Sequence, residues 1–335
     1  MTYGKPGAYS GSERRSYFIV GGAGFIGSHF ADRLLESNRT MMVTLFDNFS
    51  SGREWHVQKH LTRGDGRFRL IRGDAQNLDA MSEWMKNHDV VIHLASNPDI
   101  ARAVQDPEID FHQGTVLTNN VLEATRRAGV PRLLYASGSG VYGEAGDLLL
   151  GEDYGPLRPI STYGASKLAG EAMIASYCAM FGLRACVFRF ANVVGPRQTH
   201  GVGFDFIRRL SVEPERLQIL GDGRQSKSYI HVSDVVEAVL LACDRVKEIY
   251  QVFNVATAET LTVAEIAEMA VEAMGLKRRP YFVYTGGDRG WKGDVPVVRL
   301  DTGRIRTLGW APVLDCRQAV QQSLREIAAD ERVPV

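Results

Sequence analysis

The stretch FIVGGAGFIGSHF, residues 18–30, organises the rest of the chain. A short apolar run ends in glycines spaced G-x-x-G-x-x-G, and an amphipathic pattern follows at once. This order is typical of a strand, a tight turn and a helix whose N-terminus faces a pyrophosphate. We expect Gly21 to permit the turn, Gly24 to let the backbone approach the phosphates, and Gly27 to let the helix lie close to the strand.

Two features of the surrounding sequence support this interpretation over a purely structural glycine turn. Ile26, Phe30 and Leu34 recur at helical spacing, as an amphipathic helix requires. A second apolar run, residues 42–46, ends in Asp47, twenty residues after Gly27. An acidic residue at this distance typically holds the ribose hydroxyls of an adenosine. The sequence therefore predicts a dinucleotide site.

Composition excludes several classes of partner. The chain has 335 residues, is 44% hydrophobic, and balances 39 basic against 39 acidic side chains. A balanced charge offers no broad surface for nucleic acid. No apolar run approaches the roughly 20 residues of a membrane helix. We therefore expect neither a nucleic-acid partner nor a membrane partner.

The N-terminus and the cysteines indicate the compartment. Residues 1–15 are rich in Gly, Ser and Tyr and lack the apolar core of a signal peptide, so we interpret them as a flexible tail. The cysteines lie far apart and form no C-x-x-C, which indicates neither a zinc site nor a disulfide framework and favours a cytoplasmic protein. His93, inside a strand-like run, is interpreted as a packed histidine, and no metal is expected.

Strand-like and helix-like stretches alternate through the first half of the chain. The strands are expected at 68–71, 90–94, 132–136 and 184–190, with helices before Gly129 and from 161 to 180. Such alternation predicts an α/β fold, a Rossmann-type doubly wound parallel sheet covered on both faces. We assign residues 16–191, with a return segment at about 228–256, to a dinucleotide-binding domain. The glycine-punctuated segments 192–227 and 257–330 are assigned to a smaller C-terminal substrate-binding lobe.

The second chemical signal is the pair Tyr163 and Lys167. Residues four apart on a helix share a face. An ammonium beside a phenol favours the phenolate, so we expect Lys167 to lower the pKa of Tyr163. A tyrosine tuned in this way can take and return a hydroxyl proton near neutral pH. The motif gains weight because it follows the glycine fingerprint and a Ser-Gly-Ser-Gly strand end at 137–140.

Taken together, these motifs resemble an extended short-chain dehydrogenase/reductase of the NAD-dependent nucleotide-sugar epimerase/dehydratase type. The resemblance covers about residues 17–312. Further matches include Phe46-Asp47-Asn48, Val141-Tyr142-Gly143-Glu144, the run RFANVVGPR at 189–197, and Leu308-Gly309-Trp310.

The resemblance implies tightly held NAD, favoured over NADP because the Asp47 carboxylate would repel a 2′-phosphate. The residues that it places around the cofactor are Gly21, Gly24, Phe25, Ile26, Gly27, Asp47, Asn48, Asp74, Ala75, Leu94, Ala95, Ser96, Ser137, Tyr163, Lys167 and Phe190. Those around the nucleotide-diphosphate sugar are Asn97, Ser139, Tyr163, Asn192, Lys227, Trp291 and Lys292. Tyr163 would remove the proton of the C4 hydroxyl while hydride leaves C4, and a homodimer is expected.

Departures from the family pattern narrow the reaction. Gly138 stands where the family usually has a catalytic Ser or Thr that donates a hydrogen bond to the sugar hydroxyl. We expect Ser139 to take this role, with Ser137 as the alternative. The Asp-Glu pair of 4,6-dehydratases is absent at 139–140, as are the Glu of uronate decarboxylases and the Cys of 3,5-epimerases at Gly140. We predict a 4-epimerase, acting on a sugar bulkier than a plain hexose, such as a uronate or heptose.

Several alternatives stay open. A nucleotide-sugar 4-dehydrogenase or 4,6-dehydratase would use the same scaffold, and a non-catalytic NAD-binding regulator would need no tuned tyrosine. A serine hydrolase is disfavoured because Ser139 is not framed as G-x-S-x-G. In the lobe, Lys227 and Lys292 stand in regions where the family often has phosphate-binding arginines, and Gly114 replaces a common asparagine.

Overall fold

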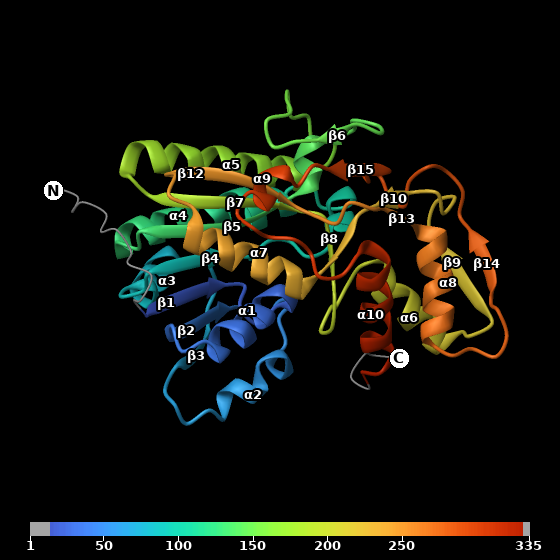
Figure 1. Cartoon of the computed structure of the whole chain (residues 1–335), viewed down its shortest axis with the longest axis horizontal. Coiled ribbons are helices and arrows are strands. Elements are labelled where there is room, and N and C mark those ends of the chain that lie inside the picture. The colour runs from blue at the N-terminus through green and yellow to red at the C-terminus, as the bar shows by residue number, and fades with distance from the viewer. Residues whose placement is uncertain (1–13, 331–335) are drawn as a thin grey trace.

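The computed structural model describes residues 14–330, and its centre is a seven-stranded parallel sheet (Figure 1). The strands follow the order β12-β7-β5-β4-β1-β2-β3. Their bounds are β1 Arg15–Val20, β2 Thr40–Asp47, β3 Phe68–Arg72, β4 Val90–His93, β5 Arg132–Gly138, β7 Arg184–Phe190 and β12 Tyr250–Val255. The sequence prediction of a doubly wound parallel sheet is confirmed.

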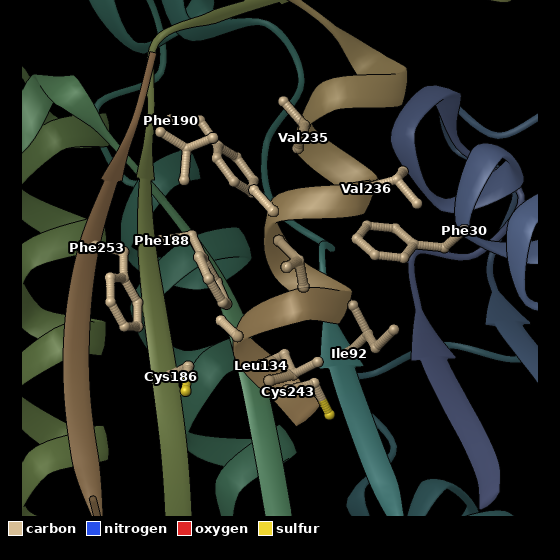
Figure 2. Close-up of a cluster of buried hydrophobic side chains, with 14 of the residues drawn as sticks. Phe30, Ile92, Leu134, Cys186, Phe188, Phe190, Val235, Val236, Cys243 and Phe253 are labelled. Carbon is tan, nitrogen blue, oxygen red and sulfur yellow. The ribbon is translucent and has the colours of Figure 1, made fainter. Parts of the chain in front are cut away.

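Helices cover both faces of this sheet because alternate strand residues point to opposite faces. The sheet-covering helices are α1 Phe25–Glu36, α3 Leu78–Met85, α4 Leu117–Ala128, α5 Thr162–Phe181 and α7 Val232–Arg245. Phe30 of α1 and Val236 of α7 pack with Ile92, Leu134 and Phe188 on one face, as Figure 2 shows. Residues of α3, α4 and α5 pack against the other face.

Caps determine where the longest helix begins and ends. The Ser161 hydroxyl accepts a hydrogen bond from Gly164 N at 3.1 Å, which satisfies a free donor of the first turn of α5. Gly182, with φ +70°, ends the helix in the left-handed conformation that glycine adopts without strain. This fixed start places Tyr163 in the first turn and Lys167 one turn later.

The smaller lobe lies beyond the strand ends and has its own core (Figure 1). Its principal elements are α6 Val202–Val212, β9 Arg216–Ile219, α8 Val263–Ala273, β14 Tyr281–Tyr284 and α10 Cys316–Ala328. Short strands connect the lobe to the main domain: β6 Leu149–Leu150, β8 Asn192–Val194, β10 Ser226–Lys227, β11 Tyr229–His231, β13 Leu261–Thr262 and β15 Val297–Leu300. Smaller helical turns are η1 Glu54–His56, α2 Gln58–Leu61, η2 Ile100–Val104, η4 Ser139–Tyr142 and α9 Gly303–Arg306.

The chain returns to the main sheet at β12, which pairs in parallel with β7 from Tyr250 to Val255. Two details differ from expectation. Arg15 belongs to β1, where its N–H bonds Arg39 O and its guanidinium bonds Asp244 at 2.6 Å, so the tail cannot extend to residue 15. Residues 1–13 of that predicted tail lie outside the described residues. A π-helical turn, η3 Phe111–Val116, precedes α4.

Three further expectations concern metals, thiols and membranes. Within residues 14–330, no cluster of three or more His, Cys, Asp or Glu side chains could bind a metal ion. The four cysteines are buried free thiols, and none of the described helices could span a bilayer. His93 is 1% exposed and its Nε2 lies 3.0 Å from Thr118 Oγ1, as predicted for a packed histidine.

Candidate active site

The glycine turn after β1 forms a cradle with no room for a Cβ at Gly21 or at Gly27. Gly21 has φ +79°, and a Cβ there would lie 2.8 Å from Ala95 N. A Cβ on Gly27 would lie 2.5 Å from Gly21 O, so only glycine lets α1 approach the turn. Helix α1 starts after Gly24 without a side-chain cap, which leaves the first-turn N–H groups of Phe25 and Ile26 for an anion.

Asp47 at the end of β2 faces this turn. Its carboxylate is 7% exposed and accepts hydrogen bonds from Ala23 N at 2.9 Å and Phe49 N at 2.7 Å. Burial raises the pKa of Asp47, while these backbone donors act in the opposite direction. Each carboxylate oxygen has a second lone pair, which leaves acceptor capacity for a diol. Asn48 Nδ2 lies 3.4 Å from Asp74 Oδ2, so the ends of β2 and β3 form one polar group.

The segment after β4 folds over the glycine turn. The N–H groups of Leu94 and Ala95 both donate to Val20 O, at 3.0 and 3.1 Å. Ser96 follows in this segment and acts on Tyr163 of α5, whose pKa it lowers. The structure therefore brings the predicted cofactor residues of β1, β2 and β4 to one edge of the sheet. Ala75 after β3 and Phe190 at the end of β7 lie at that same edge, and both are buried.

Tyr163 and Lys167 lie side by side on α5, with the Lys167 ammonium 5.4 Å from the Tyr163 ring centre. Lys167 is 4% exposed, its Nζ donates to Ala136 O at 2.8 Å, and the same atom lies 5.2 Å from the Tyr135 ring centre. The buried ammonium is thus oriented by a strand-end carbonyl between two aromatic rings.

The prediction that the pKa of Tyr163 is lowered is wrong for the protein without a bound cofactor. Burial raises the pKa of Tyr163 to about 12, although the Ser96 hydrogen bond lowers it. Burial also lowers the pKa of Lys167 to about 8, against the influence of Asp110 and Glu171. The spacing on the helix predicts that the two groups are close, but desolvation penalises both charged forms.

The serines beside Gly138 have different roles. Ser137 is 4% exposed and donates to Glu171 Oε1 at 2.6 Å, so its hydroxyl is turned under α5. Ser139 is half-buried and begins η4, and its hydroxyl has no hydrogen-bond partner among residues 14–330. Gly164 packs on this turn so closely that its Cβ would lie 2.6 Å from Gly140 O. This contact brings Ser139 next to the first turn of α5, which carries Tyr163.

Asn97, a predicted substrate residue, is engaged within the protein. Its Nδ2 donates to Asp99 O and to Asp110 Oδ1, both at 2.9 Å, and its Oδ1 accepts from Asp99 N. Asp110, which sequence reasoning missed, is 1% exposed and also accepts from Thr162 Oγ1 at 2.6 Å. No local pattern marks Asp110, because only the fold brings its loop to α5.

The departure at Gly114 has a steric explanation. A Cβ at this position in η3 would lie 2.5 Å from Ser166 Oγ and 2.7 Å from Ser166 Cβ on α5. An asparagine would therefore separate η3 from α5. Gly114 is required by the close packing of the segment that carries the catalytic candidates.

The lobe supplies the predicted phosphate-side residues. Lys227 Nζ forms an ion pair with Asp294, which also accepts from Gly290 N at 3.3 Å. Lys292 is exposed and makes no ion pair within residues 14–330, whereas Trp291 is half-buried. A Cβ on the neighbouring Gly293 would lie 3.2 Å from Ile160 O, so this loop lies against the start of α5.

Asn192 starts β8 and is exposed, and its N–H donates to Ser228 O at 3.1 Å. It therefore lies at the junction between β7 and the lobe. Its side-chain amide makes one long contact, Nδ2 to Ser228 O at 3.4 Å.

A basic cavity of about 750 Å³ lies beside the glycine turn, between the loop after β2 and the lobe. Arg53 N donates to Ala23 O at 3.1 Å, which ties the cavity wall to the turn. Arginines outnumber acids in its lining: Arg53, Arg197, Arg208, Arg209 and Arg216 stand against Asp205, Glu213 and Asp330. Sequence reasoning missed this cavity, because its arginines come from distant segments.

Arg197 joins the lobe to the glycine turn. Its guanidinium bonds Asp32 of α1 at 2.6 Å and His56 O at 2.9 Å, and His56 Nδ1 lies 2.8 Å from Ala23 O. The residue has φ +67°, an unfavourable conformation for a side chain that these contacts hold in place.

Known proteins resemble this chain in sequence and in fold. A family model described as the NAD dependent epimerase/dehydratase family matches residues 17–256. A UDP-glucose 4-epimerase from Mycolicibacterium smegmatis is 32% identical over 315 residues, covering 91% of this chain and 96% of that protein.

Two solved structures are similar over nearly the whole chain. A UDP-galactose 4-epimerase has a TM-score of 0.82 and 36% identity, covering 93% of this chain and 98% of that one. MoeE5, in complex with UDP-glucuronic acid and NAD, has a TM-score of 0.79 and 30% identity, covering 92% and 97%.

Proposed function

The chain belongs to the NAD-dependent epimerase/dehydratase family, and we propose that it is a nucleotide-sugar 4-epimerase with NAD as its cofactor. One observation supports the proposal: the Lys167 ammonium lies 5.4 Å from the Tyr163 ring centre at the start of α5, and the turn that begins at Ser139 packs on this start of the helix. A non-catalytic regulator would need the cradle alone. We further propose that segments 192–227 and 257–330 form the nucleotide-sugar-binding lobe, in a protein of the reducing cytoplasm.

The residues at the cradle fit a dinucleotide. Gly21 and Gly27 permit the tight turn, because a Cβ there would collide with Ala95 N and Gly21 O, and the uncapped start of α1 offers N–H donors for a pyrophosphate. Asp47 would accept hydrogen bonds from the adenosine ribose, and its negative charge disfavours a 2′-phosphate. When bound, NAD supplies the acceptor and later the donor of hydride and, in its oxidised form, a positive charge.

The chain's own residues move and hold the proton. Tyr163 Oη takes the proton of the C4 hydroxyl as the C4–H bond breaks, which leaves a 4-keto sugar, and later returns it. Ser139 donates a hydrogen bond to the same oxygen. Lys167, oriented by Ala136 O, stabilises the phenolate. Burial raises the pKa of Tyr163, so in the protein without cofactor this side chain is a neutral phenol. Additional positive charge at the site is needed to form the phenolate that acts as the base.

The sugar is proposed to be bulkier than a plain hexose, as a uronate or heptose is. Gly138 supports this, because a Cβ there would meet nothing within 4 Å, and at Gly140 it would make only ordinary contact, 3.6 Å from Gly164 Cα. The similar MoeE5 was solved both with UDP-glucuronic acid and with UDP-glucose, so a scaffold of this type accepts a uronate as well as a hexose. The nucleotide end of the substrate is proposed to extend toward the arginine-lined cavity.

The test is a panel of hexose, uronate and heptose nucleotides, monitored by NMR of the C4 proton. We expect inversion at C4, without net absorbance change at the nicotinamide band, and abolished turnover in Tyr163→Phe. A net rise in that absorbance would identify a 4-dehydrogenase instead. Loss of water from the sugar would identify a dehydratase. Clear preference for the plain hexose would contradict the proposal on sugar size.

A homodimer is proposed through α4 and α5, which lie together on one side of the molecule (Figure 1). The outward face of α5 supports it, because Ala172, Ala179 and Met180 are exposed and apolar. Light scattering on the purified protein is the test, and Met180→Glu is expected to shift the mass toward that of a monomer.

A further inference from the structure

Two consecutive residues at the end of β5 contact two residues one turn apart on α5. Ala136 O accepts from Lys167 Nζ at 2.8 Å, and Ser137 Oγ donates to Glu171 Oε1 at 2.6 Å. Lys167 and Glu171 are each 4% exposed. Because contacts at i and i+4 lie on one helix face, the two bonds together determine both the rotation and the axial position of α5.

A buried carboxylate is stable only when its acceptors are paired. Arg189, on the neighbouring strand β7, donates to Glu171 from Nε at 3.0 Å and from Nη2 at 2.7 Å. Its third nitrogen, Nη1, donates to Tyr142 Oη at 3.0 Å. Tyr142 ends η4, the turn that starts at Ser139. Glu171 is therefore connected to both sides of the site, the helix with Tyr163 and the turn with Ser139.

The charge of Glu171 also acts on Lys167. The groups that face the buried ammonium are two aromatic rings, a neutral histidine and two acids: Tyr135, Tyr163, His93, Asp110 and Glu171. Burial lowers the pKa of the Lys167 ammonium, and the two acids oppose this effect. Arg189 is a cation on the far side of Glu171 and forms an ion pair with its carboxylate, Nη2 to Oε2 at 2.7 Å.

We propose that Glu171 is a positioning residue for the reaction, which together with Ser137 and Arg189 holds α5 in register and keeps Lys167 charged. The inference rests on the proposed function, since it concerns the same catalytic pair. The proposal also gives Ser137 a different role: its hydroxyl donates to Glu171 of α5 and does not donate to the sugar.

The first test is Glu171→Gln, which keeps the shape and removes the charge. NMR of ¹³C-labelled lysine, with Lys167→Arg to assign the signal, follows the titration of Lys167 without any substrate. We expect the midpoint to fall by about half a pH unit or more, and the alkaline limb of kcat to move to lower pH by the same amount. Glu171→Asp, which retains the charge but shortens the side chain, is expected to lower kcat without that shift.

Loss of one partner of a buried ion pair can prevent folding. Ser137→Ala is therefore the second variant, because it removes one bond and leaves the ion pair. We expect kcat to fall by about 10-fold with KM and the pH profile unchanged, since a displaced helix misplaces Tyr163. Thr125→Val is the control, because it removes a buried hydroxyl of α4 that lies away from α5. This hydroxyl donates to Val121 O at 2.6 Å in the same helix and to Met85 Sδ at 3.5 Å in α3.

The outcomes separate the two proposals. If the wild-type protein turns over no nucleotide sugar, the proposed function fails. If it is active and Ser137→Ala keeps the wild-type kcat, the helix-positioning role is overturned. An unmoved Lys167 titration in Glu171→Gln overturns the charge role, whether or not a substrate has been found.

Discussion

The hydroxyl beside Tyr163 offers the sharpest test of the site. Ser139→Ala removes the proposed donor to the C4 oxygen. A hydrogen bond to a developing negative charge is worth about 1.5–3 kcal/mol, so kcat should fall by roughly 10- to 100-fold. Because Ser139 is half-buried and bonds no other residue within 14–330, stability should change by less than about 0.5 kcal/mol. C4 inversion measured by NMR, together with thermal unfolding, checks both values.

The same region allows the hydroxyl to be restored one residue earlier. Gly138 has extended backbone angles, φ −155° and ψ 164°, and its Cβ would meet nothing within 4 Å, so any side chain can start there. Adding Gly138→Ser to Ser139→Ala should recover at least about 10-fold of the lost kcat. Gly138→Ala in the same background is the matched control, with equal backbone effect and no hydroxyl. Full activity in Ser139→Ala, or equal recovery with alanine and serine, would refute the reasoning.

Three further results are expected. Gly27→Ala places a Cβ 2.5 Å from Gly21 O, so it should lose bound NAD and about 1–3 kcal/mol of stability. Gly64→Ala is the control, because a Cβ there meets no atom within 4 Å, and it should change neither property. Cofactor-release assays and thermal unfolding measure the two effects. Because the pKa of Lys167 is lowered to about 8, kcat should fall above that pH. Between pH 8 and the pKa of lysine in the unfolded chain, only the unfolded state keeps the proton, so the free energy of unfolding should rise with pH. Denaturant titrations of Lys167→Met should lack this rise. Arg216→Glu in the cavity should raise KM for the nucleotide sugar by several-fold with kcat retained, and the exposed Arg278→Glu should leave both unchanged.

How much could be predicted from the sequence depended on how local each feature is. The glycine cradle lies within 13 residues, and Tyr163 and Lys167 share one helix, so spacing was sufficient for both. Ser137 and Ser139 are equivalent as sequence neighbours of Gly138. Only the packing of α5 shows that one bonds Glu171 while the other remains without a partner among residues 14–330.

Environment was harder to predict than proximity. The sign of the Tyr163 pKa shift was wrong because desolvation depends on atoms from many segments, which no motif records. The same holds for Asp110, whose loop reaches α5 only in the folded chain, and for Asn97, whose amide the fold occupies. Cavity arginines from the loop after β2, α6 and β9 likewise meet only in three dimensions.

The open space around Gly138 and Gly140 has an evolutionary consequence. A Cβ can be added at these two positions without moving a neighbouring backbone, whereas at Gly21, Gly27 and Gly164 it would collide with backbone atoms. Mutations that alter the reaction are therefore separated from mutations that damage the scaffold. A descendant of this enzyme could acquire an acid or a base at the strand end in single, selectable steps, and directed evolution toward new sugar chemistry should begin there.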